Sequence, residues 1–460
     1  MPPRAHASAV PNSAVPHVIW PALPSASAAR RLSLLYQWEQ SQWWPADHLR
    51  AWQMRQVSVL LDHAIRTVPF YGERLKAAGV RPGKTVAPDV WARIPVLTRD
   101  EVQGVGADLR SARLPPDHGR VRDVTSSGST GKPVTVAKTQ LVQTVWEAMT
   151  LRDHLWHRRD LTKKLAAIRS LPRGRGVYPR GERVRAWSAA TASVYPTGPA
   201  CSLSAASTIE EQALWLKRVN PDYLLTIASS LSALPRYCLD EGIELPNLRD
   251  VTSLGAIVPP SARALCRKAW GVPLIDTYSA QEVGYIALQC PEHEHFHVQA
   301  EAAYVEVLDP DGAPCEPGTH GRVVVTPLHN LAMPLIRYEI GDFAEVGEPC
   351  PCGRGLPVLT RILGRLRNLL TLPSGQQIVA TFVNDWFEGF PVAQFQVVQR
   401  ALDLLEMKIV PQRPFTEAEE ARIRDLVADR LGPTYRVDIT YHDDIPRGPG
   451  GKYEDFKSEL

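Results

Sequence analysis

Strand-like and helical segments alternate through the middle of the chain, and this alternation limits the possible folds more than any other feature. Short apolar runs such as "DYLLTIA" (222–228) and "VTSLGA" (251–256) are typical of buried strands. Amphipathic runs such as "STIEEQALWLKRV" (207–219) and "PPSARALCRKAWG" (259–271) separate them and indicate helices. Strands that alternate with helices form a parallel sheet with helices on its faces. The sequence therefore predicts an α/β protein.

Other segments indicate that this sheet is only one part of the chain. The 460 residues are too many for a single ordinary core, so two or more domains are expected. Helical spacing runs from 30 to 78, and strands with turns dominate 303–346. A small α+β unit follows Leu370, and its clearest helix is "TEAEEARIRDLVADRLG". The Pro-, Ala- and Ser-rich start predicts a disordered lead-in.

Composition excludes several classes of function. The formal net charge is +3, and the densest basic stretch, Arg173–Arg185, is broken by Gly and Pro, as in a solvated loop. This charge pattern does not predict a nucleic-acid partner. No apolar run approaches the ~20 residues that a membrane helix needs, and the N-terminus has no apolar signal-peptide core. Seven sparse cysteines favour a reducing compartment, so we expect a cytoplasmic protein.

The stretch "VTSSGSTGKPVTV" (124–136) is a candidate phosphate-binding loop between two strands. It is not a Walker A loop, because Gly128 and Gly131 are too close together and Pro133 leads into a strand instead of a helix. Its glycines still let backbone N–H groups converge on an anion, and its side chains add hydroxyl and ammonium donors. A Gly/Ser-rich surface hairpin is the alternative. The candidate phosphate ligands are Thr125, Ser126, Ser127, Gly128, Ser129, Thr130, Gly131 and Lys132.

Five segments in order resemble the motifs of the adenylate-forming superfamily of acyl-CoA synthetases, peptide-synthetase adenylation domains and luciferases. They are "TSSGSTGKP" (125–133), "DTYSAQEVG" (276–284), "IRYEIGDF" (336–343), "ILGRLRN" (362–368) and "PRGPGGKYEDF" (446–456). Within it, the phenylacetate–CoA ligases and their capsule-biosynthesis relatives are the most similar branch. That likeness is carried by "LLDHAIRTVPFYGERL" (60–75), "MPLIRYEIGDF" (333–343) and "CPCGRGLPVLTRILGR" (350–365).

The resemblance implies a domain plan and a reaction. A lead-in (1–29) would precede an ATP- and acid-binding domain (30–364) of layered α/β sheets with a β-rich subdomain, followed by a small mobile α+β domain (365–460). The enzyme would join a carboxylic acid to AMP at the expense of ATP and pass the acyl group to a thiol, giving an acyl- or aryl-CoA thioester. An aromatic or medium apolar acid is the tendency of such enzymes, and a homodimer is compatible with the resemblance.

The resemblance also assigns roles to individual residues. Glu282 corresponds to a Mg²⁺ ligand, Arg365 to a residue that reaches the ribose or α-phosphate, and Lys452 to the catalytic lysine that bridges the carboxylate and the α-phosphate. A cation delivered late would stabilise charge where it develops. Adenine and ribose would be bound by Gly255, Ala256, Asp276, Tyr278, Ser279 and Asp342, with Asp342 accepting from the ribose hydroxyls.

The hinge segment departs from the superfamily pattern. "GRLRN" has Arg367 and Asn368 where the motif usually has two aspartates. In the superfamily this hinge lets the C-terminal domain rotate between adenylation and thiolation. The departure leaves the second half-reaction with CoA open.

Three cysteines and a histidine form a candidate zinc site. "QCPEHEHFHV" places Cys290 ahead of three histidines, and "EPCPCGRG" contains Cys350 and Cys352. The phenylacetate-ligase branch has similar Cys…His-Val and Cys-x-Cys segments, which favours His297 over His293 and His295. Four protein ligands would leave no open position on the metal, so a zinc held by Cys290, His297, Cys350 and Cys352 would be structural. Unrelated cysteines beside a solvated histidine cluster are the alternative.

Two other functions stay open at this stage. An adenylate-forming ligase could pass the acyl group to an amine or a carrier-protein thiol. A nucleotide-binding regulator without catalysis would also keep the phosphate loop, although the presence of Lys452, Glu282 and Asp342 argues against it.

The phosphate-loop assignment can be tested at Gly131. We predict that Gly131→Val weakens ATP binding, because the new side chain occupies space where the backbone must approach phosphate. Calorimetric titration with ATP measures the effect. An unchanged affinity would remove the loop from the nucleotide site.

Overall fold

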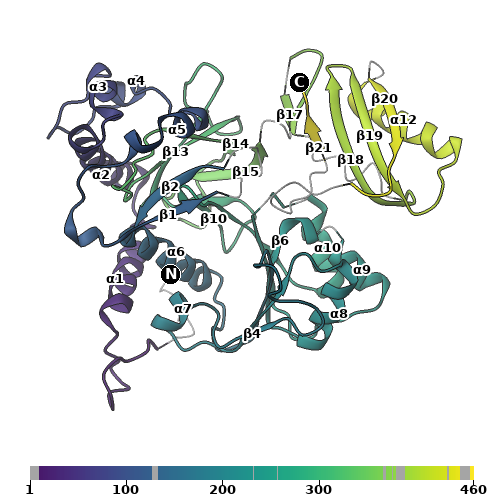
Figure 1. The fold of residues 1–460 in the computed structure, drawn as a ribbon, viewed down its shortest axis with the longest axis horizontal. Helices are drawn as coiled ribbons and strands as arrows, with labels where there is room; N and C mark the ends of the chain where they lie inside the picture. Colours follow the sequence, from purple (N-terminus) through teal and green to yellow (C-terminus); the bar gives the residue numbers. More distant parts are fainter. Residues whose placement is uncertain are drawn as a thin grey trace.

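A computed structural model of the protein describes residues 10–126, 133–231, 233–255, 257–258, 260–365, 369–375, 377–379, 389–432, 435–445 and 456–460. Figure 1 shows N-terminal helices, two large sheets that lie side by side, and a separate C-terminal unit. None of the helices in these ranges combines the length and apolarity needed to cross a lipid bilayer.

Helices cover one end of the molecule. Ser25 caps the first one, and Asn12 is hydrogen-bonded to the backbone of Ala192 and Val194, which anchors the start of the described chain. The lead-in expected over 1–29 is corrected at its end, because helix begins at Ala26; residues 1–9 lie outside the described residues. The helices are α1 (Ala26–Ser41), α2 (Ala46–Thr67), α3 (Tyr71–Ala77), α4 (Pro88–Arg93) and α5 (Arg99–Val105), with 3-10 turns η1 (Gly106–Leu109) and η2 (Pro116–His118).

The segments before and after the candidate phosphate loop form a two-stranded antiparallel ribbon. Strand β1 (Val121–Thr125) pairs with β2 (Thr135–Thr139), and helix α6 (Gln140–Trp156) begins directly after β2. The side chain of Thr139 accepts a hydrogen bond from the Val142 N–H group and so caps α6. The two strands predicted on either side of the loop are confirmed.

The six-stranded sheet confirms the predicted α/β alternation. Its order is β4-β5-β3-β6-β7-β8, and all neighbours pair in parallel except the edge strand β4. Helices α8, α9 and α10 pack on it around the buried Trp215 and Leu216. The elements are β3 (Leu165–Arg169), β4 (Glu182–Val184), α7 (Ala189–Val194), β5 (Ala200–Ser204), α8 (Ile209–Val219), β6 (Tyr223–Ile227), η3 (Ala228–Ser230), α9 (Leu234–Asp240), β7 (Asp250–Leu254), α10 (Pro260–Trp270) and β8 (Leu274–Ile275).

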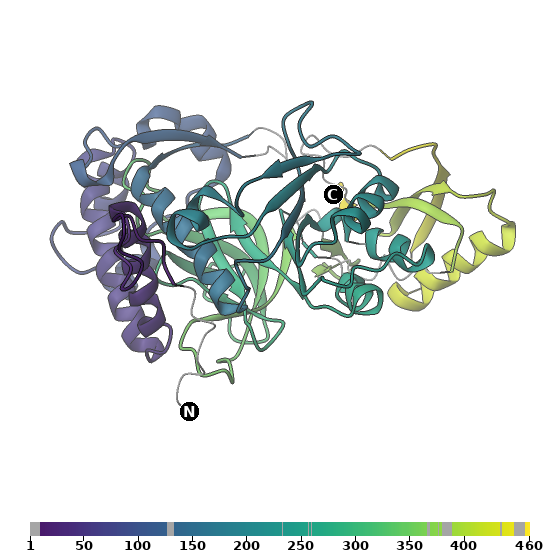
Figure 2. The ribbon, with the colours of Figure 1, turned by 90° about the horizontal axis from the view of Figure 1, so that it is seen from below.

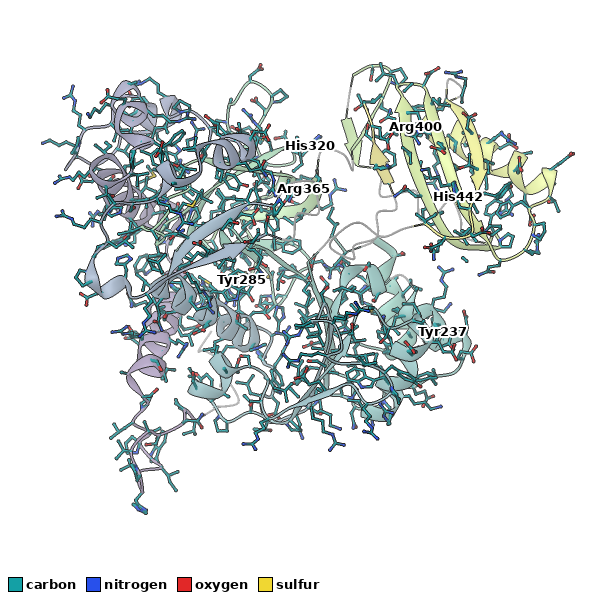
Figure 3. All side chains as sticks on the ribbon, viewed as in Figure 1. Tyr237, Tyr285, His320, Arg365, Arg400 and His442 are labelled. Atoms are coloured by element: carbon teal, nitrogen blue, oxygen red, sulfur yellow. The ribbon has the colours of Figure 1, made fainter. Side chains whose placement is uncertain are left out.

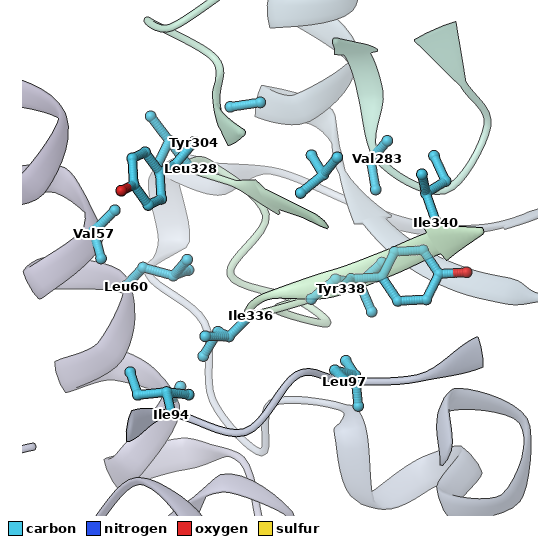
Figure 4. Packing of buried hydrophobic residues seen from close by; sticks show 14 of the residues in the cluster. Val57, Leu60, Ile94, Leu97, Val283, Tyr304, Leu328, Ile336, Tyr338 and Ile340 are labelled. Carbon is cyan, nitrogen blue, oxygen red and sulfur yellow. The ribbon is translucent and has the colours of Figure 1, made fainter. Parts of the chain in front are cut away.

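The seven-stranded sheet is antiparallel and shares its core with helices α2–α5. Ile336, Tyr338 and Ile340 of this region belong to one buried cluster with Leu60 of α2 and Leu97 before α5, and Ile340 lies beside Val283 (Figure 4). The order is β12-β13-β14-β15-β11-β10-β9. The strands are β9 (Thr277–Ala280), β10 (Gly284–Gln289), β11 (Phe296–Val298), β12 (Ala303–Leu308), β13 (His320–Pro327), β14 (Tyr338–Val346) and β15 (Val358–Arg365).

A single residue joins the two large sheets. Strand β8 ends the six-stranded sheet at Ile275, and β9 begins the seven-stranded sheet at Thr277, so Asp276 stands between them. Ser253 of β7 donates a hydrogen bond to the Asp276 carboxylate, and the Asp276 N–H donates to Oε1 of Gln289 in β10 at 2.9 Å. Asp276 therefore ties both sheets together from within the protein interior, where it is 8% exposed.

The C-terminal unit has a core of its own. Its four-stranded sheet has the order β20-β19-β18-β21, and its buried cluster draws only on residues between Leu370 and Phe456. Figures 1 and 2 both place this unit at the end of the molecule opposite the N-terminal helices. The elements are β16 (Leu369–Thr371), β17 (Gln377–Val379), β18 (Val392–Ala401), β19 (Leu404–Pro411), α12 (Glu417–Leu431), β20 (Arg436–Tyr441) and β21 (Phe456–Ser458).

Asp276 makes stability depend on pH in a defined direction. Burial raises the pKa of this carboxyl from 3.8 to about 6, against the hydrogen bonds from Ser253 and Thr277. Between pH 4 and pH 6 the folded protein keeps a proton that the unfolded chain releases, so the free energy of unfolding falls as pH rises. For the wild type, this fall in the free energy of unfolding should be about 3 kcal/mol. We predict that it is absent in Asp276→Asn, which keeps the oxygen acceptor but cannot ionise.

Chemical denaturation of both proteins between pH 4 and pH 7 checks this prediction. Asp311→Asn, at an exposed position, serves as the control and should follow the wild type. Parallel curves for wild type and Asp276→Asn would show that the buried carboxyl does not titrate in this range.

Candidate functional site

The base of the predicted phosphate loop is closed by hydrogen bonds. The Ser126 N–H donates to the Val134 carbonyl at 2.8 Å, and the Val134 N–H donates to Oγ of Ser126 at 2.9 Å. The hydroxyls of Thr125 and Thr135 are 2.9 Å apart across the ribbon. The other six candidate ligands, 127–132, lie outside the described residues. Phosphate binding by this loop therefore stays a prediction, with its two ends in place.

Glu282 occupies an unusual hairpin tip. Ala280 pairs with Gly284, so the β9–β10 hairpin has a three-residue loop with Glu282 at its centre. Hairpin tips normally face water, yet the Glu282 side chain is 5% exposed, and its Oε1 lies 3.5 Å from Nη1 of Arg99. A buried carboxylate needs a nearby positive charge, and the ion pair with Arg99 supplies one.

Arg99 connects Glu282 to the phosphate-loop base and was missed by the sequence analysis. It is the first residue of α5, directly after the Thr98 N-cap, and its Nη2 donates to Oγ of Ser126 at 3.3 Å. A cation at this position opposes the helix macrodipole, which favours anions at a helix N-terminus. That local conflict was the available signal of a role outside the helix.

The Asp342 carboxylate contacts two other predicted site residues, Tyr278 and Arg365. Its Oδ2 accepts a hydrogen bond from the Tyr278 hydroxyl at 2.8 Å, and its Oδ1 lies 2.9 Å from Nε of Arg365. Asp342 is on β14 and Tyr278 on β9, which are not neighbours in the sheet, so the sheet curls until these side chains meet. Figure 3 shows Arg365 on the side that faces the C-terminal unit. Three residues predicted from separate motifs thus lie in one cluster.

The Asp342 carboxylate keeps acceptor capacity for a ligand. An ionised carboxylate has about four lone-pair sites, and Tyr278 and Arg365 use two of them. Burial raises the pKa of Tyr278 well above its ordinary value, and the Asp342 charge adds to this, so the phenol stays protonated and donates. With 8% of its surface exposed, Tyr278 offers little ring face for stacking on adenine in this arrangement.

Gly341 makes the close pairing of Asp342 and Arg365 feasible. Its φ is +85°, a conformation that side chains rarely adopt, and a Cβ there would lie 3.2 Å from Nη1 of Arg365. A side chain at this position would strain the backbone and crowd the guanidinium.

The remaining predicted nucleotide residues fall at strand ends or outside the described residues. Gly255 is exposed at the carboxyl end of β7, the usual ligand edge of a parallel sheet, and Ser279 is on β9 opposite Tyr285. Asp276 serves the sheet junction, and its predicted contact with ribose stays untested. Ala256, Arg367, Asn368 and Lys452 are outside the described residues.

The Cys/His segments come together as predicted, with one addition. The ligand atoms of Cys290, His295, His297 and Cys350 all lie within 4.8 Å of one another. Three of the four predicted ligands are thus in the cluster, and the fourth, Cys352, contacts it with its Sγ 3.5 Å from Nε2 of His297. His295, which the sequence analysis set aside, is the other member, with Nε2 2.9 Å from Sγ of Cys350. The signal was the His-x-His spacing, which points both side chains to one face of an extended segment.

The donor set fits a tetrahedral metal. Sγ of Cys290 and Sγ of Cys350 are 3.9 Å apart, close to the roughly 3.8 Å that tetrahedral geometry with 2.3 Å zinc–sulfur bonds gives. Burial lowers the pKa of His297 to about 3, which leaves a neutral imidazole suited to ligation. Burial raises the pKa of Cys350 to about 12, so a bound cation would be needed to keep its thiolate in this environment. The cluster could therefore hold zinc.

Comparisons with known proteins agree with this architecture. Residues 370–459 match the family described as the CapK C-terminal domain. The chain is 26% identical over 449 residues to the phenylacetate-coenzyme A ligase of Thermus thermophilus, covering 89% of this chain and 96% of that protein. It is also 26% identical over 440 residues to the phenylacetate-coenzyme A ligase of Escherichia coli, covering 88% and 93%.

A solved structure extends the comparison to the fold. The 2-hydroxyisobutyryl-CoA ligase in the postadenylation state, in complex with 2-HIB-AMP, matches with a TM-score of 0.69 at 17% identity, covering 92% of this chain and 90% of that chain. The resemblance to adenylate-forming enzymes, with the phenylacetate–CoA ligase branch as relatives, is thereby confirmed. The expected α/β fold class, with a large N-terminal part and a small C-terminal one, is also confirmed.

The Cys/His cluster yields a prediction about metal content. Protein purified without a tag or chelator should contain about one zinc per chain, and Cys350→Ser should lose it. Elemental analysis measures the content. Cys315 is half-buried and lies outside the cluster, so the Cys315→Ser variant should retain the metal. Folded wild-type protein without metal would contradict the assignment.

The same measurement identifies the fourth ligand. If His295 completes the site, His295→Ala should lower the zinc content more than Cys352→Ser. The reverse order would support the set predicted from the sequence.

Proposed function

We propose that this protein is an ATP-dependent, AMP-forming carboxylate–CoA ligase that acts through an acyl-adenylate. The observation that carries the proposal is the hydrogen-bonded and ion-paired cluster of Tyr278, Asp342 and Arg365. Its members come from three separate motifs of adenylate-forming enzymes, in a chain similar over 89% of its length to a phenylacetate-coenzyme A ligase.

The arrangement of charges suits the first half-reaction. A carboxylate oxygen attacks the α-phosphate of ATP, and pyrophosphate leaves, so two anions must be brought together. Arg99 at the loop base and Arg365 beside Asp342 supply fixed positive charge on either side of the site. Such preorganised charge stabilises the transition state without reorganisation during the reaction. Asp342 would accept from the ribose hydroxyls through its unused lone pairs.

Mg²⁺ would be held at Glu282. A carboxylate oxygen suits this hard ion, and magnesium usually binds through one or two carboxylates together with substrate phosphates. Glu282 already faces Arg99, which in turn contacts Ser126 at the end of β1. The carboxylate, the guanidinium and the loop base would therefore meet the phosphates at one place.

In the second half-reaction, the CoA thiolate would attack the acyl carbonyl and AMP would leave with the bonding electrons. The proposal includes three further points: the substrate is an aromatic or medium apolar acid, the C-terminal unit rotates for the transfer step, and the protein forms a homodimer. Transfer to an amine or a carrier protein is the competing route, since Arg367 and Asn368 alter the hinge. The Cys/His cluster would hold a structural zinc that joins the β10–β11 turn to the segment before β15.

A pyrophosphate-release screen over carboxylic acids tests the activity. Release that depends on both acid and ATP supports the ligase, and trapping of the product in the presence of CoA or amines identifies the acceptor. ATP binding without acid-dependent release from any acid would leave a nucleotide-binding protein instead.

The role of Lys452 separates the two half-reactions. We predict that Lys452→Ala loses acid-dependent pyrophosphate release by at least about a hundredfold, because it removes the charge that bridges carboxylate and α-phosphate. The variant should still convert a chemically supplied acyl-adenylate to thioester, since the lysine would have moved away with the C-terminal unit.

Paired half-reaction assays check this prediction. Lys457→Ala serves as the control, because Lys457 lies in the same unit and is ion-paired with Glu459. Equal loss in both halves would indicate a structural role for Lys452, and no loss in either would exclude it from the site.

A further inference from the structure

Lys138 is a buried cation beside the proposed reaction centre. It lies on β2, directly after the predicted phosphate loop, and is 6% exposed. Within the part of the chain that the structure describes, its ammonium forms no hydrogen bond or ion pair. Lysines are almost never fully buried without a partner, because an uncompensated charge in the interior is strongly unfavourable.

The surroundings of Lys138 compensate its charge only in part. Its Nζ lies 5.7 Å from the ring centroid of Trp146 on α6, a cation–π contact. The Trp146 ring packs on Tyr285 of β10 with centroids 4.8 Å apart, and the Tyr285 hydroxyl lies 3.1 Å from Oγ1 of Thr150. Lys138 thus adjoins a wall of two aromatic side chains from α6 and β10.

This wall includes a residue of the hairpin that carries Glu282, the proposed Mg²⁺ ligand. Glu282 is three residues before Tyr285 on the β9–β10 hairpin, and its charge is close enough to act on the ammonium. Burial lowers the pKa of Lys138 to about 8, while Glu282 acts to raise it, so the side chain is still mostly protonated at neutral pH. The ammonium is therefore available to pair with an anion at neutral pH.

We propose that Lys138 determines acid specificity by binding a second carboxylate at the far end of the substrate, whose ring or apolar body contacts Trp146 and Tyr285. The substrate class is then an aromatic or compact dicarboxylic acid. This inference rests on the proposed ligase function and narrows its substrate.

The argument is one of charge balance. Arg99, Arg365 and Lys452 are assigned to the phosphates and the reacting carboxylate, so Lys138 is a cation beyond those that the common chemistry uses. An acid with an apolar end would leave the Lys138 ammonium without a partner against hydrocarbon. Sites that can pair with a polar group discriminate strongly against substrates that lack it, because the group of the protein is left unpaired. A second carboxylate would complete the missing ion pair.

The test compares matched acids with and without the second carboxylate. Phenylacetate is paired with 4-carboxyphenylacetate, and benzoate with isophthalate and terephthalate. For the wild type, kcat/KM in acid-dependent pyrophosphate release should be at least tenfold higher for the preferred diacid than for its monoacid. Lys138→Met should reduce the diacid value by about a hundredfold or more and should leave the monoacid value unchanged or higher, because the unpaired ammonium that disfavours monoacids is gone.

Two further variants control for charge and folding. Lys164→Met removes a lysine whose Nζ donates to the Val219 carbonyl at 2.8 Å, away from this wall, and should not change selectivity. Lys138→Arg keeps the charge and should restore most of the diacid preference. The thermal midpoint of Lys138→Met should equal or exceed that of the wild type; if this variant unfolds, Lys138→Gln takes its place in every assay.

The outcomes separate this inference from the proposed function. Unchanged selectivity in Lys138→Met, or an equal loss with every acid, overturns the inference, because Lys138 would then be dispensable or would serve the groups that all acids share. If the wild type releases no pyrophosphate with any acid, the ligase proposal fails. Calorimetric titration with the diacids, without ATP, then tests the second-carboxylate site by itself. Binding at least tenfold weaker in Lys138→Met supports the second-carboxylate site, whereas equal or absent binding overturns it.

Discussion

The whole arrangement depends on how the two large sheets are joined. Asp276 is the only residue between the last parallel strand and the first strand of the antiparallel sheet, and it is fixed from both sides by Ser253 and Gln289. Because the connection has no slack, the β9–β10 hairpin must start at the carboxyl edge of the parallel sheet. Tyr278 and Glu282 are therefore placed by the fold and not by a flexible loop, as a preorganised site requires.

Charge is the second organising element. Arg99, Lys138 and Arg365 approach the site from α5, β2 and β15, and the acidic groups that face them, Glu282 and Asp342, come from the antiparallel sheet. Positively charged side chains that come close together repel one another unless anions lie between them. The protein supplies two carboxylates, Glu282 beside Arg99 and Asp342 beside Arg365, and under the proposed function the substrates would bring further negative charge.

Much of this could be predicted from the sequence, where local pattern and tertiary structure agree. Hydrophobic periodicity, which burial of one face of a strand or helix imposes, predicts the parallel strands, α10, α12 and the β1–β2 ribbon. Motif order also located Tyr278, Asp342 and Arg365, which meet only in the folded chain. The Cys/His segments converge for the same reason, since each carries its ligands at short spacing.

What sequence analysis missed depends on contacts between distant elements. Arg99 and Lys138 belong to no recognisable motif, and their surroundings follow from the hairpin that carries Glu282 and from the packing of α6. His295 was set aside because the choice among three histidines depends on where Cys350 lies after folding. The start of α1 at Ala26 was missed because the Ser25 cap stands within a Pro- and Ala-rich stretch that reads as irregular.

The packing of the N-terminal helices on β14 sets the order in which a ribosome-bound chain can fold. The Tyr71 hydroxyl donates to the Pro334 carbonyl, 263 residues later, and the Arg337 guanidinium is bound by the Ile94 carbonyl and by Glu306. The apolar face that contains Leu60 and Leu97 is therefore synthesised long before Ile336 and Tyr338 can cover it. At about 5–20 residues per second, this interval lasts on the order of 10–50 s. During that time the nascent chain exposes apolar surface of the kind that makes incompletely folded chains prone to aggregate.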